Sequence, residues 1–285
     1  MKNLSSLLAP LARRYIAGET IADAIAAARA LNTARIKATI DNLGENVTDE
    51  RETAASVNEY IELLERISSE GVDSTVSLKL THMGLDISDE LAYANARAVV
   101  KKAHELDNFV RLDMEGSKYT QRTIEILLRL HGEYRNCGVA IQCMLRRSPS
   151  DVSLLTGKGA SVRLVKGAYK ESPEIAFSAK GEVDASYSTL MRELLLGGTR
   201  PAIATHDEKL INEAIRFAAG NNIPKDRFEF QMLLGIKRTL QRKLAGEGYT
   251  VRVYVPYGSN WLPYTLRRLR ERRENVYFVL KNIFD

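Results

Sequence analysis

The sequence predicts an α/β protein with the (βα)8 architecture of a TIM-type barrel, and three observations support this fold. Eight short runs rich in β-branched residues recur along the 285 residues. Their starts lie 22–41 residues apart, which is enough for a strand, two loops and a helix. Stretches with helical spacing of apolar residues fill the gaps, and no linker divides the chain.

A short helical lead-in precedes the first run. Thr20 and Asp23 have the spacing of a capping box, which marks a helix start, and residues 22–31 behind them are rich in alanine. We therefore expect residues 1–32 to form an N-terminal helical segment and residues 33–285 to form the barrel.

The eight runs have the length and composition of β-strands, because β-branched and aromatic side chains favour a pleated, half-buried surface. In chain order they cover residues 34–40, 75–80, 109–114, 138–144, 160–165, 201–205, 228–233 and 251–255.

Amphipathic helices are predicted between the runs, because apolar residues recur there every three to four positions. The clear cases are residues 53–67, 89–106, 120–130, 207–219, 236–244 and 261–272. Weaker patterns at 149–156 and 184–196 complete the alternation. Residues 171–183 have no pattern and are predicted to form a loop. The last helix, after the eighth strand, is expected to lie over the active site.

Two other folds share parts of this pattern. A doubly wound open sheet also alternates strands and helices, but residues 41–46, after the first run, lack the G-x-G-x-x-G turn typical of that fold. An antiparallel sheet with one wet face has the same polar alternation, but the intervening helices disfavour it.

The composition is that of an ordinary globular protein. Hydrophobic residues make up 45% of the chain, charged residues 27%, and the net charge is +5, which excludes collagenous and disordered classes. Two cysteines are too few for a disulfide framework. The four histidines form no H-E-x-x-H motif, so no metal site is expected. No apolar run approaches the roughly 20 residues of a membrane span, and we expect a cytoplasmic protein.

The polar face of the strands indicates where the chemistry lies. Strand residues alternate between two faces, so if helices cover the outside, Lys79, Asp113, Gln142, Gln231 and Tyr254 point into the barrel. Barrel enzymes place their active sites at the carboxyl ends of the strands. The pattern therefore predicts a polar pocket for a charged small molecule.

The last predicted helix carries a second signal. Tyr264, Arg267, Arg268 and Glu271 share one face, and two adjacent arginines can clamp a carboxylate. The alternative is a solvated basic helix or a nucleic-acid patch at 267–273.

Two further positions, His206 and Lys166, are open between a functional and a structural role. His206 ends the sixth strand, where a histidine is either structural or catalytic. Lys166 stands next to Gly167, which either lets the backbone approach a ligand closely or makes a plain strand-ending turn.

Nine segments, in order along nearly the whole chain, resemble the proline dehydrogenase family, the flavin-dependent barrel enzymes that oxidise L-proline. They are LGE at 43–45, SLKL at 77–80, LDME at 112–115, IQCML at 141–145, VRLVKGAY at 162–169, ATHDE at 204–208, FEFQML at 228–233, VRVYVPYG at 251–258 and YTLRRLRE at 264–271. The last segment is the most specific, and the likeness is to the monofunctional bacterial members.

The resemblance implies FAD as the cofactor and two catalytic residues, Asp113 and Arg163. Asp113 would position Lys79 and Tyr254, and Arg163 would lie beside the reactive edge of the flavin. Glu45 would pair with Arg267 and gate the pocket. The residues implied to bind proline are Lys79, Tyr254, Tyr264, Arg267 and Arg268. Those implied to hold FAD are Met114, Gln142, Arg163, Lys166, Gly167, Ala168, Thr205 and His206.

The same resemblance implies the reaction and its partners. L-Proline would be oxidised to Δ1-pyrroline-5-carboxylate, a quinone would reoxidise the flavin, and contact with the inner face of a membrane would be peripheral at most. Nothing resembles an aldehyde dehydrogenase domain, so a separate dehydrogenase would oxidise the product.

Two alternative functions are open. One is a cofactor-free barrel lyase that uses Lys79 or Lys166 as a Schiff base, and the other is a nucleic-acid-binding protein.

Overall fold

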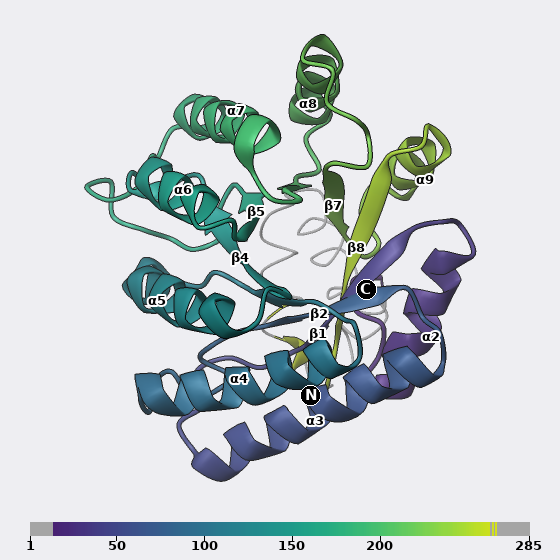
Figure 1. Ribbon diagram of the computed structural model, residues 1–285, viewed down its shortest axis with the longest axis vertical. Helices are drawn as coiled ribbons and strands as arrows, with labels where there is room; N and C mark the ends of the chain where they lie inside the picture. Colours follow the sequence, from purple (N-terminus) through teal and green to yellow (C-terminus); the bar gives the residue numbers. More distant parts are fainter. Residues whose placement is uncertain (1–13, 263, 265, 267–285) are drawn as a thin grey trace, which may run out of the picture.

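The computed structural model describes residues 14–262 together with 264 and 266, and their eight parallel strands form a closed barrel in the order β1 to β8 (Figure 1). Pairing of β1 with β8 closes it, from Lys37 opposite Arg252 to Asn42 opposite Tyr257. The strands are β1 (Lys37–Asn42), β2 (Ser74–Leu78), β3 (Val110–Leu112), β4 (Cys137–Gln142), β5 (Ser161–Val165), β6 (Ala202–Ala204), β7 (Glu229–Leu233) and β8 (Thr250–Tyr257). All eight predicted strands are confirmed.

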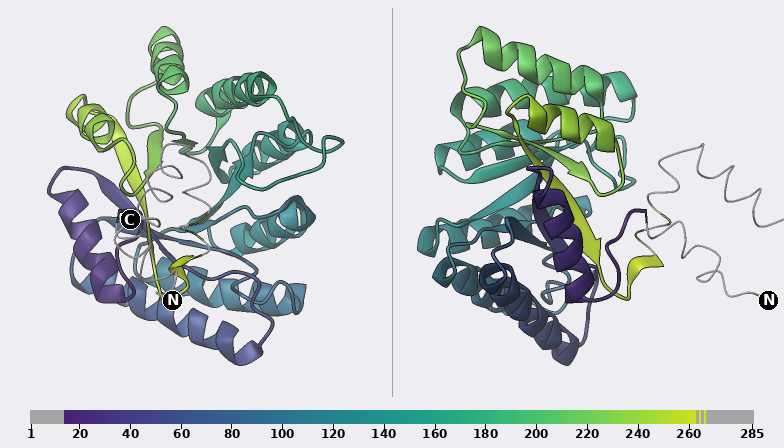
Figure 2. Two further views of the ribbon diagram at one scale, coloured as in Figure 1. Left: turned by 180° about the vertical axis from the view of Figure 1, so that it is seen from behind. Right: turned by 90° about the vertical axis from the view of Figure 1, so that its right-hand side faces the viewer.

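Helices follow the first seven strands and form a ring outside the barrel (Figures 1 and 2). They are α3 (Glu50–Ser69), α4 (Asp89–Glu105), α5 (Ser117–Glu133), α6 (Ser148–Gly157), α7 (Lys180–Gly197), α8 (Glu208–Gly220) and α9 (Arg238–Gly246). The prediction of a loop throughout 171–183 is wrong at its end, because α7 begins at Lys180. There the Glu182 carboxylate accepts the backbone N–H of Ala179, which stabilises the first turn.

The lead-in helix α2 (Ile21–Asn32) completes the ring. Thr20 and Asp23 form the predicted capping box, and the buried face of α2 packs against β1 and β8. In Figure 1 this helix lies between α9 and α3, where a helix following β8 would otherwise complete the ring. The predicted helix at 261–272 lies largely outside the described residues.

The strands have an apolar outer face and a polar inner face. In β2 and β5, Val76, Leu78, Val162 and Leu164 are buried against the surrounding helices, and this burial supplies most of the favourable free energy of folding. The alternate residues point into the barrel as predicted, and Lys79, Asp113, Gln142, Gln231 and Tyr254 border one internal cavity.

The amino-terminal end of the barrel interior is also charged. Arg252 of β8 pairs with Glu229 of β7, with Nε 2.9 Å from Oε1. Arg111 of β3 instead donates to backbone oxygens, 2.6 Å from Ser161 O and 3.3 Å from Val139 O. Burial lowers the pKa of Arg111 to about 9, because it opposes the charged form.

None of the described helices combines the length and the apolar composition that a membrane crossing requires.

The interior pair of Arg252 and Glu229 gives a prediction about stability. Glu229→Gln leaves the Arg252 guanidinium without its counter-charge, and we expect the free energy of unfolding to fall by about 3–5 kcal/mol, measured by urea denaturation. The matched control is Glu65→Gln, because Glu65 pairs with Lys102 on the surface at the same 2.9 Å and should cost under about 1 kcal/mol. Equal losses in the two variants would contradict the prediction.

Candidate active site

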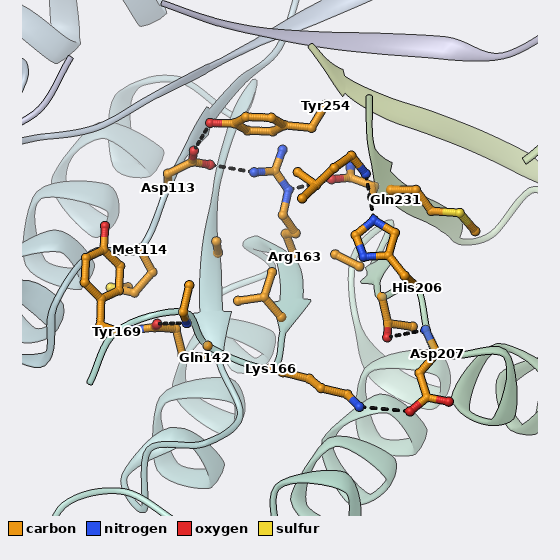
Figure 3. A pocket seen from close by; sticks show the side chains of 18 of the residues that line it. Asp113, Met114, Gln142, Arg163, Lys166, Tyr169, His206, Asp207, Gln231 and Tyr254 are labelled. Carbon is orange, nitrogen blue, oxygen red and sulfur yellow. Dashed lines mark hydrogen bonds and ion pairs between the residues drawn. The ribbon is translucent and has the colours of Figure 1, made fainter. Parts of the chain in front are cut away.

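A cavity of about 450 Å³ opens at the carboxyl ends of the strands, a size typical of small-molecule sites. Its walls come from strands β2 to β8 and the loops that follow them (Figure 3). One part of the wall is formed by charged, hydrogen-bonded side chains, namely Lys79, Asp113 and Arg163. Apolar side chains line much of the rest, namely Met114, Ala140, Val165, Ala168, Ala204, Met232 and Leu233.

Asp113, directly after β3, is the centre of the polar part of the site. Its Oδ1 accepts from Arg163 Nη1 at 2.5 Å, and its Oδ2 accepts from the Tyr254 hydroxyl at 2.6 Å (Figure 3). Lys79 Nζ is farther away, 3.8 Å from Oδ2. The predicted neighbourhood of Asp113, Arg163, Lys79 and Tyr254 is thus present in the structure.

The Arg163 guanidinium is held on three sides. Besides its bond to Asp113, Nε donates to Gln231 Oε1 at 2.5 Å and Nη2 donates to Ser77 Oγ at 2.9 Å. Its side chain is only 5% exposed. A guanidinium with this many fixed partners cannot swing out of the site, so it presents a fixed positive charge to the cavity.

The nearest partner of Lys79 is Asp41, which the sequence analysis missed. Lys79 Nζ lies 3.1 Å from Asp41 Oδ1 and 2.9 Å from Oδ2. Residues 41–46 are mostly polar residues with one glycine, a composition typical of a loop, yet β1 continues through Asn42. Alternation with Thr39, whose hydroxyl meets that of Ser77 inside the barrel, was the signal that could have found Asp41.

Burial and charge act in opposite directions on this pair. Burial raises the pKa of Asp41 to about 6, although the Lys79 ammonium opposes the rise. Burial by itself would lower the pKa of Lys79, but the carboxylates of Asp41 and Asp113 outweigh it and raise that pKa above its ordinary value. At neutral pH the pair is therefore an ion pair.

Gln142, at the end of β4, connects two loops at the cavity. Its Nε2 donates to Glu115 O at 2.9 Å, and its Oε1 accepts from Ala168 N at 3.4 Å. The Glu115 carboxylate in turn accepts from Thr81, from Oγ1 at 2.5 Å and from N at 3.2 Å. This buried contact between the loops after β2 and β3 had no signal in the sequence.

Lys166 lies at the cavity edge in an acidic environment. Its Nζ is 2.6 Å from Asp184 Oδ1 on α7. It also lies 3.0 Å from Asp207 Oδ2 at the start of α8 (Figure 3). Gly167 follows with a φ of +122°, and a Cβ there would lie 2.3 Å from Met144 Sδ. A strand-ending turn packed on Met144 thus explains this glycine.

Thr205 and His206 border the cavity after β6. The Thr205 hydroxyl accepts from Asp207 N at 3.1 Å, and His206 Nε2 accepts from Leu233 N at 2.9 Å. The histidine therefore links the carboxyl ends of β6 and β7, which is a structural contact, while its ring also borders the cavity.

Of the remaining predicted site residues, two are described by the structure and two are not. Tyr264 is buried, borders the cavity and packs with Tyr15, Ile16 and Leu43. Glu45 is half-buried in the loop after β1. Its predicted partner Arg267, and Arg268, lie outside the described residues.

A close contact fixes the loop that carries Glu45. A Cβ on Gly44 would lie 2.3 Å from Nε2 of His82. The same nitrogen is 2.7 Å from Ser56 Oγ on α3, and burial lowers the pKa of His82 to about 4. The loop after β1 thus rests on a neutral imidazole from the loop after β2.

The fold and this site define a barrel enzyme that binds a small charged molecule at the carboxyl ends of its strands. Comparison with known proteins makes the class specific. Residues 24–281 match the family model described as "Proline dehydrogenase", and the chain belongs to the proline dehydrogenase family. It is therefore an oxidoreductase that oxidises proline, the first step of proline catabolism.

Full-length relatives support this assignment. The chain is 41% identical to proline dehydrogenase 1 of Bacillus subtilis (strain 168) over 95% of this chain and 90% of that protein. It is 38% identical to the proline dehydrogenase of Deinococcus radiodurans, over 96% and 90% of the two chains.

A solved structure with the same fold comes from a larger protein. It is proline utilization A (PutA) from Bdellovibrio bacteriovorus inactivated by N-propargylglycine, with a TM-score of 0.88 and 28% identity. The match covers 95% of this chain but 34% of that one.

The contact between Gly44 and His82 gives a prediction. Gly44→Ala forces a methyl group into the imidazole ring, and we expect the free energy of unfolding to fall by about 1–3 kcal/mol, measured by urea denaturation. The control is Gly132→Ala in α5, where a Cβ meets nothing within 4 Å and stability should rise by about 0.5–1 kcal/mol. If Gly44→Ala is no less stable than the parent protein, the close packing is not a constraint.

Proposed function

We propose that the cavity binds FAD together with L-proline, and that the chain catalyses hydride transfer from C5 of proline to give Δ1-pyrroline-5-carboxylate. The observation that carries this proposal is a pair of cations fixed beside an apolar chamber, Arg163 by Asp113 and Lys79 by Asp41. A flavin ring has apolar faces and a polar edge, so this combination of surfaces suits it. FAD, when bound, supplies the hydride acceptor.

The residues proposed to hold the cofactor lie around the apolar part of the cavity. Arg163 and Gln142 would offer N–H groups to the polar edge of the ring, and the Arg163 charge would stabilise negative charge there. Lys166 stands at the rim with two carboxylate partners. The full proposed set is Met114, Gln142, Arg163, Lys166, Gly167, Ala168, Thr205 and His206.

Lys79 is proposed to bind the proline carboxylate. Its ammonium is fixed at the cavity wall, and a charge-assisted contact there holds the substrate in one orientation. Tyr254 and Tyr264 border the same space and would enclose the pyrrolidine ring and exclude water. Arg267 and Arg268 complete the proposed carboxylate site, and Glu45 is its proposed gate.

The lysine environments argue against the Schiff-base alternative. Burial alone would lower the pKa of both Lys79 and Lys166, but their carboxylate neighbours raise it in each case. A lysine held as an ammonium ion has no lone pair with which to attack a carbonyl. Both side chains are better suited to binding anions.

The electron acceptor and pathway partners are also proposals. We propose that a quinone reoxidises the flavin, that any contact with a membrane surface is peripheral, and that a separate dehydrogenase oxidises the product. The chain covers 24% of the bifunctional protein PutA of Escherichia coli, to which it is 26% identical.

Flavin binding and its reduction by proline can be tested by absorption spectroscopy. The purified protein should show a flavin absorption spectrum, and L-proline added without oxygen should bleach it, because proline is the hydride donor. Pyrrolidine, which has the ring but no carboxylate for Lys79, is the control and should bleach it far more slowly. A colourless protein that takes up no FAD would falsify the proposal.

The role of Lys79 can be tested by Lys79→Met, which keeps most of the side-chain volume but removes the charge. We expect the KM for proline to rise by about ten- to a hundredfold, the range of one hydrogen bond to a charged group, in steady-state assays. Lys102→Met is the control, because Lys102 pairs with Glu65 on the surface and should leave KM unchanged. An unaltered KM in Lys79→Met would remove Lys79 from the substrate site.

A further inference from the structure

We propose that Asp41 is a positioning residue of the active site, whose carboxylate holds the Lys79 ammonium where the substrate carboxylate meets it. This inference rests on the proposed function, in which Lys79 binds proline. It assigns a role to a buried charge on β1 that the proposed chemistry does not itself use. Asp41 acts through Lys79 and has no direct contact with substrate in this role.

The geometry singles out Asp41 as the main partner of Lys79. Both carboxylate oxygens lie within 3.1 Å of Nζ, whereas the nearer oxygen of Asp113 is 3.8 Å away. The Asp41 side chain is fully buried and that of Lys79 is 10% exposed. The Tyr60 hydroxyl, 3.5 Å from Asp41 Oδ1, donates to Ser77 O at 2.8 Å. A buried carboxylate needs a partner of opposite charge, and here that partner is Lys79.

Asp41 also separates two sets of contacts. The Asp113 oxygen nearest to Lys79 is Oδ2, which accepts from the Tyr254 hydroxyl at 2.6 Å. Without Asp41, Oδ2 would be the nearest carboxylate oxygen for the ammonium, and Lys79 would compete with Tyr254 for it. With Asp41 present, Asp113 is left to Arg163 and Tyr254, and Nζ stays at the cavity wall.

The charge on Lys79 depends on the groups around it. Burial works against the ammonium, and the carboxylates of Asp41, Asp113 and Glu115 favour it. His82, on the turn that follows, is neutral at physiological pH because burial lowers its pKa to about 4.

Two other side chains face the same space, the Tyr254 hydroxyl from β8 and the Arg163 guanidinium from β5. Neither supplies negative charge at neutral pH. Burial lowers the pKa of Lys79, and without Asp41 fewer carboxylates counteract this effect. The pKa of Lys79 therefore falls, and its charge is lost at a lower pH than in the parent protein.

The first experiment compares Asp41→Asn with the parent holoenzyme. The probe is tetrahydrofuran-2-carboxylate, which keeps the ring and carboxylate of proline but has no N–H, and its affinity is measured by calorimetry. We expect binding about ten- to a hundredfold weaker, with the KM for proline raised more than kcat is lowered. The loss should grow from neutral to alkaline pH, whereas the parent affinity stays level, because only the variant's Lys79 loses its proton there.

Tyr60→Phe is the matched control. It removes a buried hydroxyl 3.5 Å from Asp41 Oδ1 but keeps the carboxylate. We expect parent-like affinity and pH dependence, so an effect of general loosening in this part of the barrel is separated from an effect of the charge.

A double-mutant cycle tests whether Asp41 acts through Lys79. Adding Asp41→Asn to Lys79→Met should leave probe affinity unchanged, because the ammonium to be positioned is already gone. This comparison is available even if Asp41→Asn alone does not fold, because the double variant leaves no unpaired charge. The inference is overturned by parent-like affinity and pH dependence in Asp41→Asn, or by a further loss of affinity in the Lys79→Met background.

Failure of the two proposals can be told apart. If the parent holoenzyme binds no ring carboxylate and proline does not bleach the flavin, the proposed function fails and this inference fails with it. If the parent protein binds the probe and oxidises proline while Asp41→Asn behaves like it, the assignment of Asp41 alone is wrong.

Discussion

Charge pairing inside the barrel is the constraint on which the rest of the structure depends. The strands turn their apolar face toward the helices, so their charged face is enclosed by the barrel, where an unpaired ion is costly. The structure meets this cost with a connected chain of contacts from the amino-terminal end to the mouth. In order, its members are Arg252, Glu229, Gln231, Arg163, Asp113, Tyr254, Lys79 and Asp41. Its ionised members are three cations and three anions, so the interior network balances before any ligand binds.

The same interior network contributes both to the stability of the barrel and to the chemistry of the cavity. Arg163 has its partners on β2, on β7 and directly after β3, so it links these strands and at the same time presents charge to the cavity. Buried ion pairs contribute little net stability compared with apolar packing, but losing one partner is expensive. The outer apolar layer therefore stabilises the barrel, and the inner charged layer keeps the cations where an anionic substrate is expected to meet them.

Strand alternation explains why most of the inward-pointing site residues could be predicted from the sequence. Contacts made by loops and between distant elements could not be predicted in this way. A period of two placed Lys79, Asp113, Gln142 and Tyr254 inside the barrel without knowledge of their partners. Asp41 was missed because the polar residues after Ile40 are typical of a loop, although pairing with β8 keeps the chain extended through Asn42. The carboxylates around Lys166 come from α7 and α8, 18 and 41 residues away, a distance at which sequence spacing carries no contact information. The roles implied for Arg267 and Arg268 stay predictions.

The helix that covers the seam between β8 and β1 also affects the mouth of the barrel. In a regular (βα)8 ring, the helix after β8 covers the seam between β8 and β1. Here α2, which precedes β1, packs against both strands and fills that place (Figure 1). Among the described residues after β8, Tyr264 borders the cavity and packs on Tyr15 and Ile16, just ahead of α2. The lead-in segment thus shapes the active site indirectly, because it takes over a structural position and supplies part of the apolar surface on which Tyr264 rests.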